Sequence, residues 1–193
     1  MYKYLYLTKT EWADTWINGG DIPISLASTY LHDEREGILT PDENLIHESP
    51  VDIKSLSPLV NFGEGGGVKS FTMTNCSVNG VSMPDIVDAK YYSEDGLILS
   101  FCNSLDESIA KRLGKQCCVK VSKLKEFRKV IDKQLGVKGV MQSCEYTDNH
   151  ERNHFLKSTD DAWQDEFRLF WRYQNNTTVT IPQGHAKLVA TYE

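Results

Sequence analysis

The feature that most constrains this fold is a period of two along residues 163–172. Apolar side chains, including Trp163, Phe167 and Trp171, take most of the odd positions, and polar side chains take most of the even ones. Because successive side chains of a strand point to opposite faces, the pattern predicts a strand with one face in the core and one polar face. An Asn-Asn pair then turns the chain toward residues 177–181, which predicts a hairpin.

The other periodic segments are short. A GLILSF run at residues 96–101, bounded by polar residues, predicts a central strand. Leu124, Phe127 and Ile131 recur at helical spacing and predict a basic, amphipathic helix over residues 123–135, stopped by Gly136. Further strands are expected over residues 2–7, 21–26, 71–76 and 116–121, and further helices from a cap at Thr8 or Thr10 to Gly19 and from a cap at Ser104 to Gly114.

The strand and helix signals do not alternate regularly, which favours an α+β fold over a doubly wound one. We expect a mixed, strongly twisted sheet of about six or more strands with short helices at its sides. A chain of 193 residues fits one domain, and we assign residues 1–193 to it. The hydrophobic fraction of 40% is sufficient for an ordinary core.

Composition limits the location and the partners. The net charge of −6 disfavours general coating of nucleic acid and leaves only a local basic cleft open. No apolar stretch approaches the roughly 18 residues needed to span a bilayer, and the first residues carry no signal-peptide cleavage site. The five cysteines form no C-x-x-C pair and are expected to be reduced thiols. These features predict a cytoplasmic protein.

Gln164 and Glu166 are the first candidates for catalysis. Two residues apart on a strand, they would project from the same face. A carboxylate there can hold the ribose hydroxyls of a nucleotide and stabilise the oxocarbenium-like sugar that forms as nicotinamide leaves NAD, while the amide orients a nucleophile. The structural alternative is that these residues, with Arg168 and Arg172, form the solvated face of an edge hairpin in which Glu and Arg pair.

The second candidate is the unit that runs from Ile98 through a short helix to a returning strand. It resembles the middle of the ADP-ribosyltransferase superfamily, in which a strand ending in Ser-Thr-Ser precedes a short helix and a strand. Ser100 takes the first serine position, whereas Phe101 and Cys102 depart from the motif. A buried strand with a capped helix explains the same residues structurally.

The stretch Gln164-Asp-Glu166 resembles the third signature of the same superfamily, a Gln-x-Glu that opens a late strand. This resemblance implies an ADP-ribosyltransferase-like α+β fold with NAD as the substrate. Glu166 would be the catalytic glutamate, Gln164 would orient the acceptor, and Ser100 would support the nicotinamide pocket.

The first signature of the superfamily, an arginine or histidine on the opening strand, has no clear counterpart in residues 2–6. By resemblance, Tyr4, Ser25, Tyr30 or Arg35 would take over the contacts with the cofactor, the last two from a long polar loop. Such a protein would transfer ADP-ribose to a protein or nucleic acid, or hydrolyse NAD. The expected setting is bacterial or phage toxicity or defence, with an antitoxin or a phage or host protein as a further partner.

Residues 97–171 also resemble a widespread uncharacterised bacterial domain. That domain pairs a Ser-Phe-Ser strand with a late Lys-x-x-x-Trp-x-x-Glu-x-Arg stretch, which the residues from Lys157 to Arg168 approximate. No established activity accompanies this likeness, so it supports the fold more than the function.

Two other functions stay open. The run from His150 to His154 satisfies the H-E-x-x-H pattern, and on a helix both histidines would bind zinc with Glu151 as the base, although the polar flanks favour a solvated loop. The alternative from a different class is a non-enzymatic phage or bacterial protein that sequesters a protein or nucleotide partner. An enzyme should place Gln164 and Glu166 beside Ser100 in a concave site, whereas a binder should expose its aromatic residues.

Overall fold

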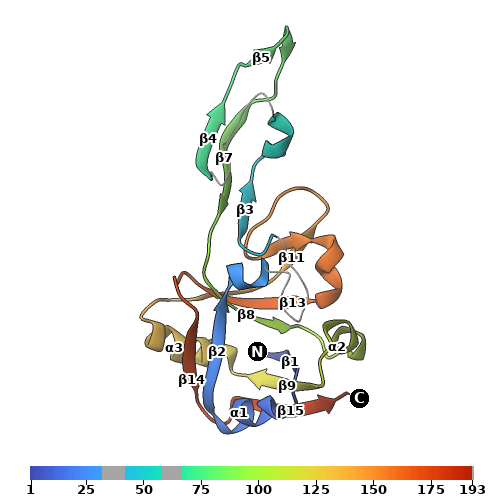
Figure 1. The fold of residues 1–193 in the computed structure, drawn as a ribbon, viewed down its shortest axis with the longest axis vertical. Helices are drawn as coiled ribbons and strands as arrows, with labels where there is room; N and C mark the ends of the chain where they lie inside the picture. Colours follow the sequence, from blue (N-terminus) through green and yellow to red (C-terminus); the bar gives the residue numbers. More distant parts are fainter. Residues whose placement is uncertain (32–41, 58–66, 193) are drawn as a thin grey trace.

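The computed structural model describes residues 1–31, 42–57 and 67–192. These form a body, which holds one large sheet, and a long narrow arm (residues 45–57 and 67–93) that rises from it (Figure 1). The α-helices of the described residues are α1 (Trp12–Asn18), α2 (Glu107–Leu113) and α3 (Leu124–Leu135), and the 3-10 helices are η1 (Ala27–Leu31), η2 (Ile53–Leu56) and η3 (Thr159–Gln164).

The large sheet follows the order β10, β13, β8, β1, β9, β15, with β2 joined to both β8 and β14. Its strands are antiparallel, and the one parallel pairing among the described residues joins the small strands β11 and β12. The α+β class is therefore confirmed, but the prediction of a mixed sheet is wrong for the large sheet, whose described pairings are all antiparallel. The body strands are β1 (Tyr2–Leu7), β2 (Gly20–Leu26), β8 (Leu97–Cys102), β9 (Cys117–Ser122), β10 (Val140–Ser143), β11 (Glu145–Thr147), β12 (Leu156–Ser158), β13 (Glu166–Trp171), β14 (Thr177–Ile181) and β15 (Ala186–Thr191).

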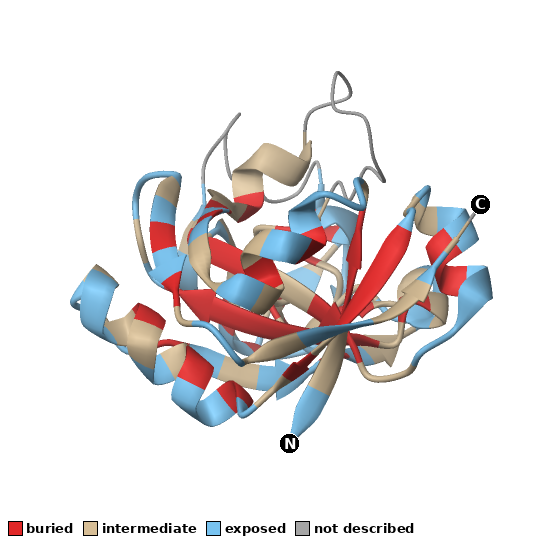
Figure 2. Ribbon diagram, turned by 90° about the horizontal axis from the view of Figure 1, so that it is seen from below, coloured by how far each residue is buried: buried red, intermediate tan, exposed pale blue. Residues whose placement is uncertain are grey.

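The strand predicted to be central is central. β8 pairs with β13 on one side and with β1 and β2 on the other. Its Leu97, Ile98 and Phe101 are almost fully buried, as the apolar run predicts. In Figure 2 the strands inside the sheet are largely buried, whereas the helices are buried on one side only.

The prediction of a solvated polar face on β13 is wrong. β13 lies between β8 and β10, and all six of its residues are buried. Glu166 and Arg168 retain only 5% and 2% of their exposure. Period-two alternation separates the two faces of a strand, but it does not show that other segments of the chain cover the polar one.

The predicted hairpin is also wrong in its pairing. β14 pairs with β2 and not with β13, because both edges of β13 are already occupied by β8 and β10. The chain only bends at Gln174 and Asn175, and Asn176 Oδ1 accepts a hydrogen bond from the Leu26 backbone N–H at 2.8 Å.

The main core lies on the face of the sheet that α1 and α3 cover. Trp16 of α1 stacks on Phe127 of α3 with ring centroids 5.6 Å apart. Leu124, Phe127 and Ile131, the residues that predicted the helix, are fully buried in this core. Part of the opposite face carries a smaller core cluster to which α2 contributes, formed by Tyr6, Cys102, Ile109, Ala110 and Cys118.

The helix ends were predicted well at glycine and less well at the caps. Gly114 and Gly136 end their helices at φ 62° and 69°, in the left-handed region that glycine adopts without strain. The cap of α2 is Asp106, which accepts from Ser108 N–H at 2.7 Å, and not Ser104. α1 starts after Glu11 without a side-chain cap, so neither Thr8 nor Thr10 serves as one.

The arm is a narrow ladder in which β7 lies between β3 and β4, with the small hairpin of β5 and β6 at the tip (Figure 1). Its own core is a small cluster around Ile53, Leu56, Ile86 and Ala89. Part of the long polar loop that was expected after Ser28 is thus strand β3. The arm strands are β3 (Leu45–Glu48), β4 (Val68–Met73), β5 (Ser77–Val78), β6 (Val81–Ser82) and β7 (Ile86–Ser93).

Two expectations from composition can be compared with the structure. All five cysteines are free, as predicted from their number and spacing. Within the described parts of the chain, no helix is both long and apolar enough to cross a membrane.

Candidate functional site

Most of the predicted site residues lie on one face of the large sheet, opposite α1 and α3. Glu166 of β13 pairs with Cys102 of β8, and Arg168 pairs with Ser100. Residues directly opposite each other in an antiparallel pair point to the same face, so Ser100 and Glu166 share it.

The same register brings two of the predicted cofactor contacts to this face. Tyr4 of β1 pairs with Cys102, and Ser25 of β2 pairs with Ile98, which lies opposite Phe170 of β13. Five strands of the sheet therefore contribute to one surface, since β10 places Gln142 opposite Arg168.

A cluster of buried charges occupies the centre of this face. Arg168 donates from Nε to Glu166 Oε1 at 2.7 Å and from Nη2 to Glu166 Oε2 at 3.1 Å, and Nη2 also lies 2.5 Å from Glu43 Oε1. Lys157 Nζ donates to Glu166 Oε2 at 3.0 Å. We call Glu43, Lys157, Glu166 and Arg168 the buried ionic cluster. Its two carboxylates balance its two cations.

Burial alone raises the pKa of Glu166, but Arg168 and Lys157 outweigh it, and a hydrogen bond from Ser100 adds to their effect. Together they lower the pKa from 4.5 to about 2. Glu43 differs, because burial raises its pKa and Glu166 repels its charge, while Arg168 compensates only in part. Burial lowers the pKa of Lys157, yet Glu166 raises it above the usual value. Glu166 is thus the carboxylate that the cluster holds ionised.

The depressed pKa of Glu166 predicts acid sensitivity. A carboxylate whose pKa falls on folding stabilises the protein above its unfolded pKa and loses that contribution as the pH falls through the folded value. Between pH 4.5 and about pH 2, Glu166 should therefore remove on the order of 3 kcal/mol from the free energy of unfolding. Urea unfolding at pH 5, 4, 3 and 2 measures this loss.

The matched control for that measurement is Glu166→Gln, which cannot titrate. Glu43 acts in the opposite direction, because its raised pKa favours the folded state as the pH falls, and the charge of Glu166 contributes to that raised pKa. Both proteins therefore also carry Glu43→Gln, so that the difference between them isolates Glu166. Equal losses of stability between pH 5 and pH 2 in both would contradict the assignment.

Gln164 lies close to Glu166, but the two do not project from one strand as predicted. It ends η3, Asp165 follows at φ 44°, and β13 begins only at Glu166, so the two side chains do not alternate along one strand. They are joined through Lys157, whose Nζ also donates to Gln164 Oε1 at 3.0 Å. The amide and the carboxylate are close, but a buried cation lies between them.

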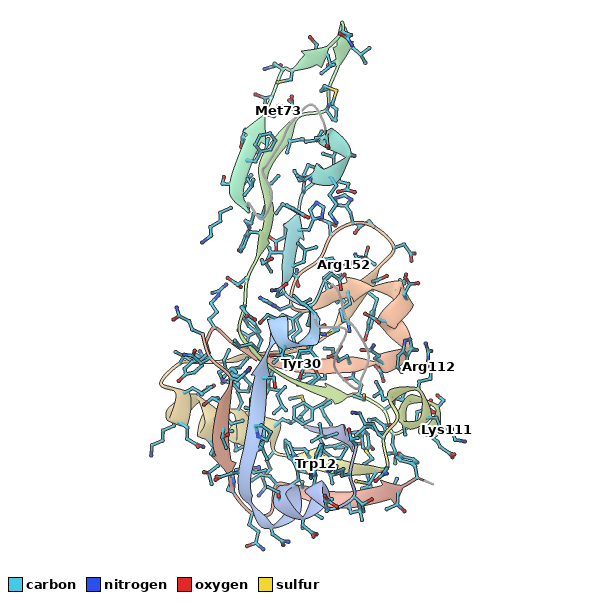
Figure 3. The ribbon with its side chains drawn as sticks, viewed as in Figure 1. Trp12, Tyr30, Met73, Lys111, Arg112 and Arg152 are labelled. Carbon is cyan, nitrogen blue, oxygen red and sulfur yellow. The ribbon has the colours of Figure 1, made fainter. Side chains whose placement is uncertain are left out.

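Of the remaining predicted contacts, Tyr4 lies on this face, on β1. Tyr4 packs edge to face against Tyr2 with ring centroids 5.8 Å apart. Tyr30 lies in η1, near the place where the arm meets the body (Figure 3). Arg35 lies outside the described residues.

The H-E-x-x-H run is not helical, so its two histidines do not share a helix face. His150 Nε2 contacts the Ser49 carbonyl at 2.8 Å, and His154 Nε2 contacts Glu94 Oε2 at 3.2 Å. Arg152, between them, bonds Asp42 at 2.6 Å at the junction of arm and body (Figure 3). In the part of the chain that the structure describes, no group of three or more His, Cys, Asp or Glu could hold a metal ion.

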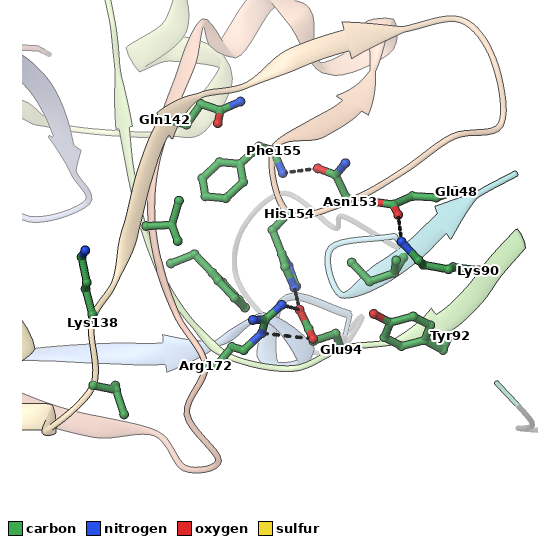
Figure 4. A pocket seen from close by; sticks show the side chains of 14 residues that line it. Glu48, Lys90, Tyr92, Glu94, Lys138, Gln142, Asn153, His154, Phe155 and Arg172 are labelled. Carbon is green, nitrogen blue, oxygen red and sulfur yellow. Dashed lines mark hydrogen bonds and ion pairs between the residues drawn. The ribbon is translucent and has the colours of Figure 1, made fainter. Parts of the chain in front are cut away.

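A pocket of about 510 Å³ opens beside the buried ionic cluster, where the arm meets the body (Figure 4). We call it the junction pocket. β3 and β7 line it from the arm, and β10, β13 and the segment before β12 line it from the body. Its lining residues are Ile46, Glu48, Lys90, Tyr92, Glu94, Val137, Lys138, Val140, Gln142, Asn153, His154, Phe155, Phe170 and Arg172.

The junction pocket and the buried ionic cluster share a wall. Phe170 and Arg168 lie on the same face of β13, and Arg168 Nη1 donates to the His154 carbonyl at 2.9 Å. The His154 ring stacks on Phe170 with centroids 3.8 Å apart and an interplanar angle of 21°. The cluster thus positions one wall of the pocket.

The sequence pointed to Lys157 only within a resemblance and to His154 only as a possible zinc ligand, and it gave no indication of Glu43 or Glu94 as site residues. A local signal existed for Lys157, since it opens the stretch that leads to Glu166 and Arg168. None existed for the pocket, because its residues come from five separate segments of the chain.

No protein-family model matches this chain, and neither a curated protein nor a solved structure shows significant similarity to it.

Proposed function

We propose that this chain is a non-enzymatic binding protein that holds a nucleotide in the junction pocket. The lining of the pocket carries the proposal, because aromatic rings, amides and exposed cations from arm and body surround one space of about 510 Å³. Small-molecule sites usually enclose ~300–1,000 Å³ and combine apolar walls with a few polar groups. A nucleotide presents the matching set, which is a flat ring, a polar ring edge and a phosphate.

Rings and amides suit the base. Tyr92 and Phe155 are half-buried in the pocket wall, beside the buried stack of His154 on Phe170. Stacking of a base on an aromatic side chain contributes about 1–3 kcal/mol. Asn153 Oδ1 accepts from the Phe155 N–H at 2.9 Å, which leaves its amide donors for a ring edge.

Two cations suit the phosphate. Lys138 is exposed at the pocket and forms no ion pair with another described residue. Arg172, whose side chain is 79% exposed, contacts Glu94 at 3.2 Å. An exposed ion pair of this kind contributes little, so Arg172 can exchange Glu94 for a phosphate, with which it forms stronger charge-assisted hydrogen bonds.

The surroundings of Glu166 favour binding over catalysis. Both oxygens of its carboxylate are already bonded to Arg168 or Lys157, and the residue is only 5% exposed. A carboxylate neutralised in this way has little charge left for a developing sugar cation. Its role in the proposal is to hold the wall of the junction pocket.

NAD-dependent ADP-ribosyl transfer on an ADP-ribosyltransferase-like fold is the second candidate function. The observation that favours it is that Glu166 and Ser100 share one face, with Glu166 held ionised and bonded to Ser100, and that Lys157 joins Gln164 to Glu166. In this candidate the cluster would have to open before Glu166 could face the ribose of NAD.

One titration separates the two candidates. We expect AMP, ADP-ribose and NAD to bind in calorimetry, with no nicotinamide released from NAD. Lys138→Ala/Arg172→Ala should raise the dissociation constants about tenfold or more, because two charged contacts to phosphate are lost. The control Lys111→Ala/Lys187→Ala removes the same charge outside the pocket and should bind like wild type.

The outcomes are distinct. If none of the three nucleotides binds at millimolar concentration, or if both double variants bind like wild type, the binding proposal is wrong. Release of nicotinamide by wild type, reduced about 10²-fold or more by Glu166→Gln, would establish the transferase instead.

A further inference from the structure

The junction pocket also has cations on its arm side, which the proposed phosphate contacts do not use. Lys90 lines the pocket from β7. Lys69 of β4 lies beside the wall of the pocket, because its Nζ is 5.8 Å from the ring centroid of Tyr92, a lining residue. We call Lys69 and Lys90 the arm-side cations, and Lys138 and Arg172 the body-side cations.

The strand register places the arm-side cations on the face of the arm that borders the pocket. Val68 of β4 pairs with Tyr91 of β7, which packs against the small core of the arm. Because neighbouring residues of a strand point to opposite faces, Lys69, next to Val68, shares the other face with Tyr92. Lys90 precedes Tyr91 and therefore lies on that face as well.

The two groups of cations lie on opposite sides of the junction pocket. The arm-side cations come from β4 and β7, whereas Lys138 lies between α3 and β10 and Arg172 directly follows β13. The pocket opens between these two parts of the chain, and Figure 4 shows Lys90 at the right of the view and Lys138 at the left. A ligand in the pocket therefore has cations on two sides.

Carboxylates balance only part of this charge. Glu48 pairs with Lys90 at 2.8 Å, and Glu94 pairs with Arg172 at 3.2 Å. The other cation of each group is exposed and forms no ion pair with another residue that the structure describes. Each side of the pocket therefore keeps one surplus positive charge, in a chain whose net charge is −6.

We infer that the ligand of the junction pocket is a free nucleotide with a phosphate on each side of its ribose, as in adenosine 3′,5′-bisphosphate. The inference rests on the proposed function, because the pocket walls supply the site for the base. The body-side cations hold one phosphate and the arm-side cations hold the other, through charge-assisted hydrogen bonds. ADP, whose two phosphates lie at one end, reaches only one group of cations.

The test is calorimetry with AMP, ADP and adenosine 3′,5′-bisphosphate, the last two of which are isomers. We expect the bisphosphate to bind about tenfold or more tightly than ADP, because its phosphates form charge-assisted contacts on both sides of the pocket. Lys69→Gln should remove most of this difference and leave the binding of AMP and ADP unchanged.

The control is Lys54→Gln, which acts on the opposite face of the arm. Lys54 Nζ lies 5.9 Å from the ring centroid of Tyr91, so each substitution removes an exposed lysine from beside a tyrosine ring, and only Lys69 is at the pocket. The inference is overturned if the bisphosphate binds no more tightly than ADP, or if both variants bind it equally. A trinucleotide that binds as tightly and with the same dependence on Lys69 would overturn the assignment to a free nucleotide.

The outcomes separate this inference from the proposed function. If AMP and ADP bind through the body-side cations and the bisphosphate binds no more tightly, the inference fails and the proposed function stands. If binding of the bisphosphate depends on Lys69 but not on Lys138 and Arg172, the arm-side contact stands. The phosphate contacts of the proposed function are then the part that fails.

Discussion

Replacing Arg168 by methionine is expected to lower the free energy of unfolding by about 3–5 kcal/mol, one of the two largest effects we predict. Arg168 is 2% exposed and is the one member of the buried ionic cluster that contacts both Glu43 and Glu166. Without it, two buried carboxylates lie close together with only Lys157 to balance them. Urea unfolding at pH 7 measures the loss.

The control for this experiment is Arg172→Met, four residues further along the chain and 79% exposed in its side chain. A surface substitution of this kind should change the stability by no more than about 0.5 kcal/mol. If the Arg168 variant lost no more stability than the control, the buried ionic cluster would not stabilise this face of the sheet. Other contacts would then have to hold the wall of the junction pocket in place.

Replacing Trp171 by alanine is expected to cost about 3–5 kcal/mol, because the side chain is fully buried in the main core and its removal leaves a large cavity. Trp171 also ties the sheet to α3, since its Nε1 donates to Asp132 Oδ1 at 2.7 Å. Thermal and urea unfolding of the variant measure the effect.

Trp171→Phe separates packing from the hydrogen bond. Phenylalanine keeps most of the ring, and Asp132 keeps its contacts with the Gly139 N–H and Arg128, so the expected loss is only about 1–2 kcal/mol. Equal destabilisation by Ala and Phe would show that the hydrogen bond, and not the buried area, holds α3 to β13.

The two effects concern opposite faces of one strand. Odd-numbered residues of β13 enter the main core, and even-numbered residues form the buried ionic cluster and a wall of the junction pocket. A substitution at Arg168 should therefore disturb ligand binding as well as stability, whereas one at Trp171 should act mainly through stability and through the position of α3.

Local structure was largely predictable from the sequence. The strand at residues 2–7 and the helix that became α3 were located by periodicity, because the side chains that must share a face lie close together in the chain. Gly114 and Gly136 marked helix ends for a reason that is also local, since only glycine adopts the left-handed conformation without cost.

The gathering of Ser100 and Glu166 was also predictable, because both lie on strands and both matched one family pattern. The state of Glu166 was not. Its ionic partners include Glu43, which is far away in the sequence and lies next to no recognisable motif. The same polar pattern along a strand can give a solvent-exposed face in one fold and a buried cluster of paired charges in another.

The sequence by itself therefore determined the α+β class, most of the elements and the candidate carboxylate, all of which depend on neighbours within a few residues. Only the tertiary structure decided that β14 pairs with β2, that Arg168 and Lys157 balance the charge of Glu166, and that arm and body enclose a pocket. These outcomes depend on contacts between segments that are distant in the sequence. Whether a side chain is buried, and which charge it pairs with, is set by those contacts and not by any one stretch of the chain.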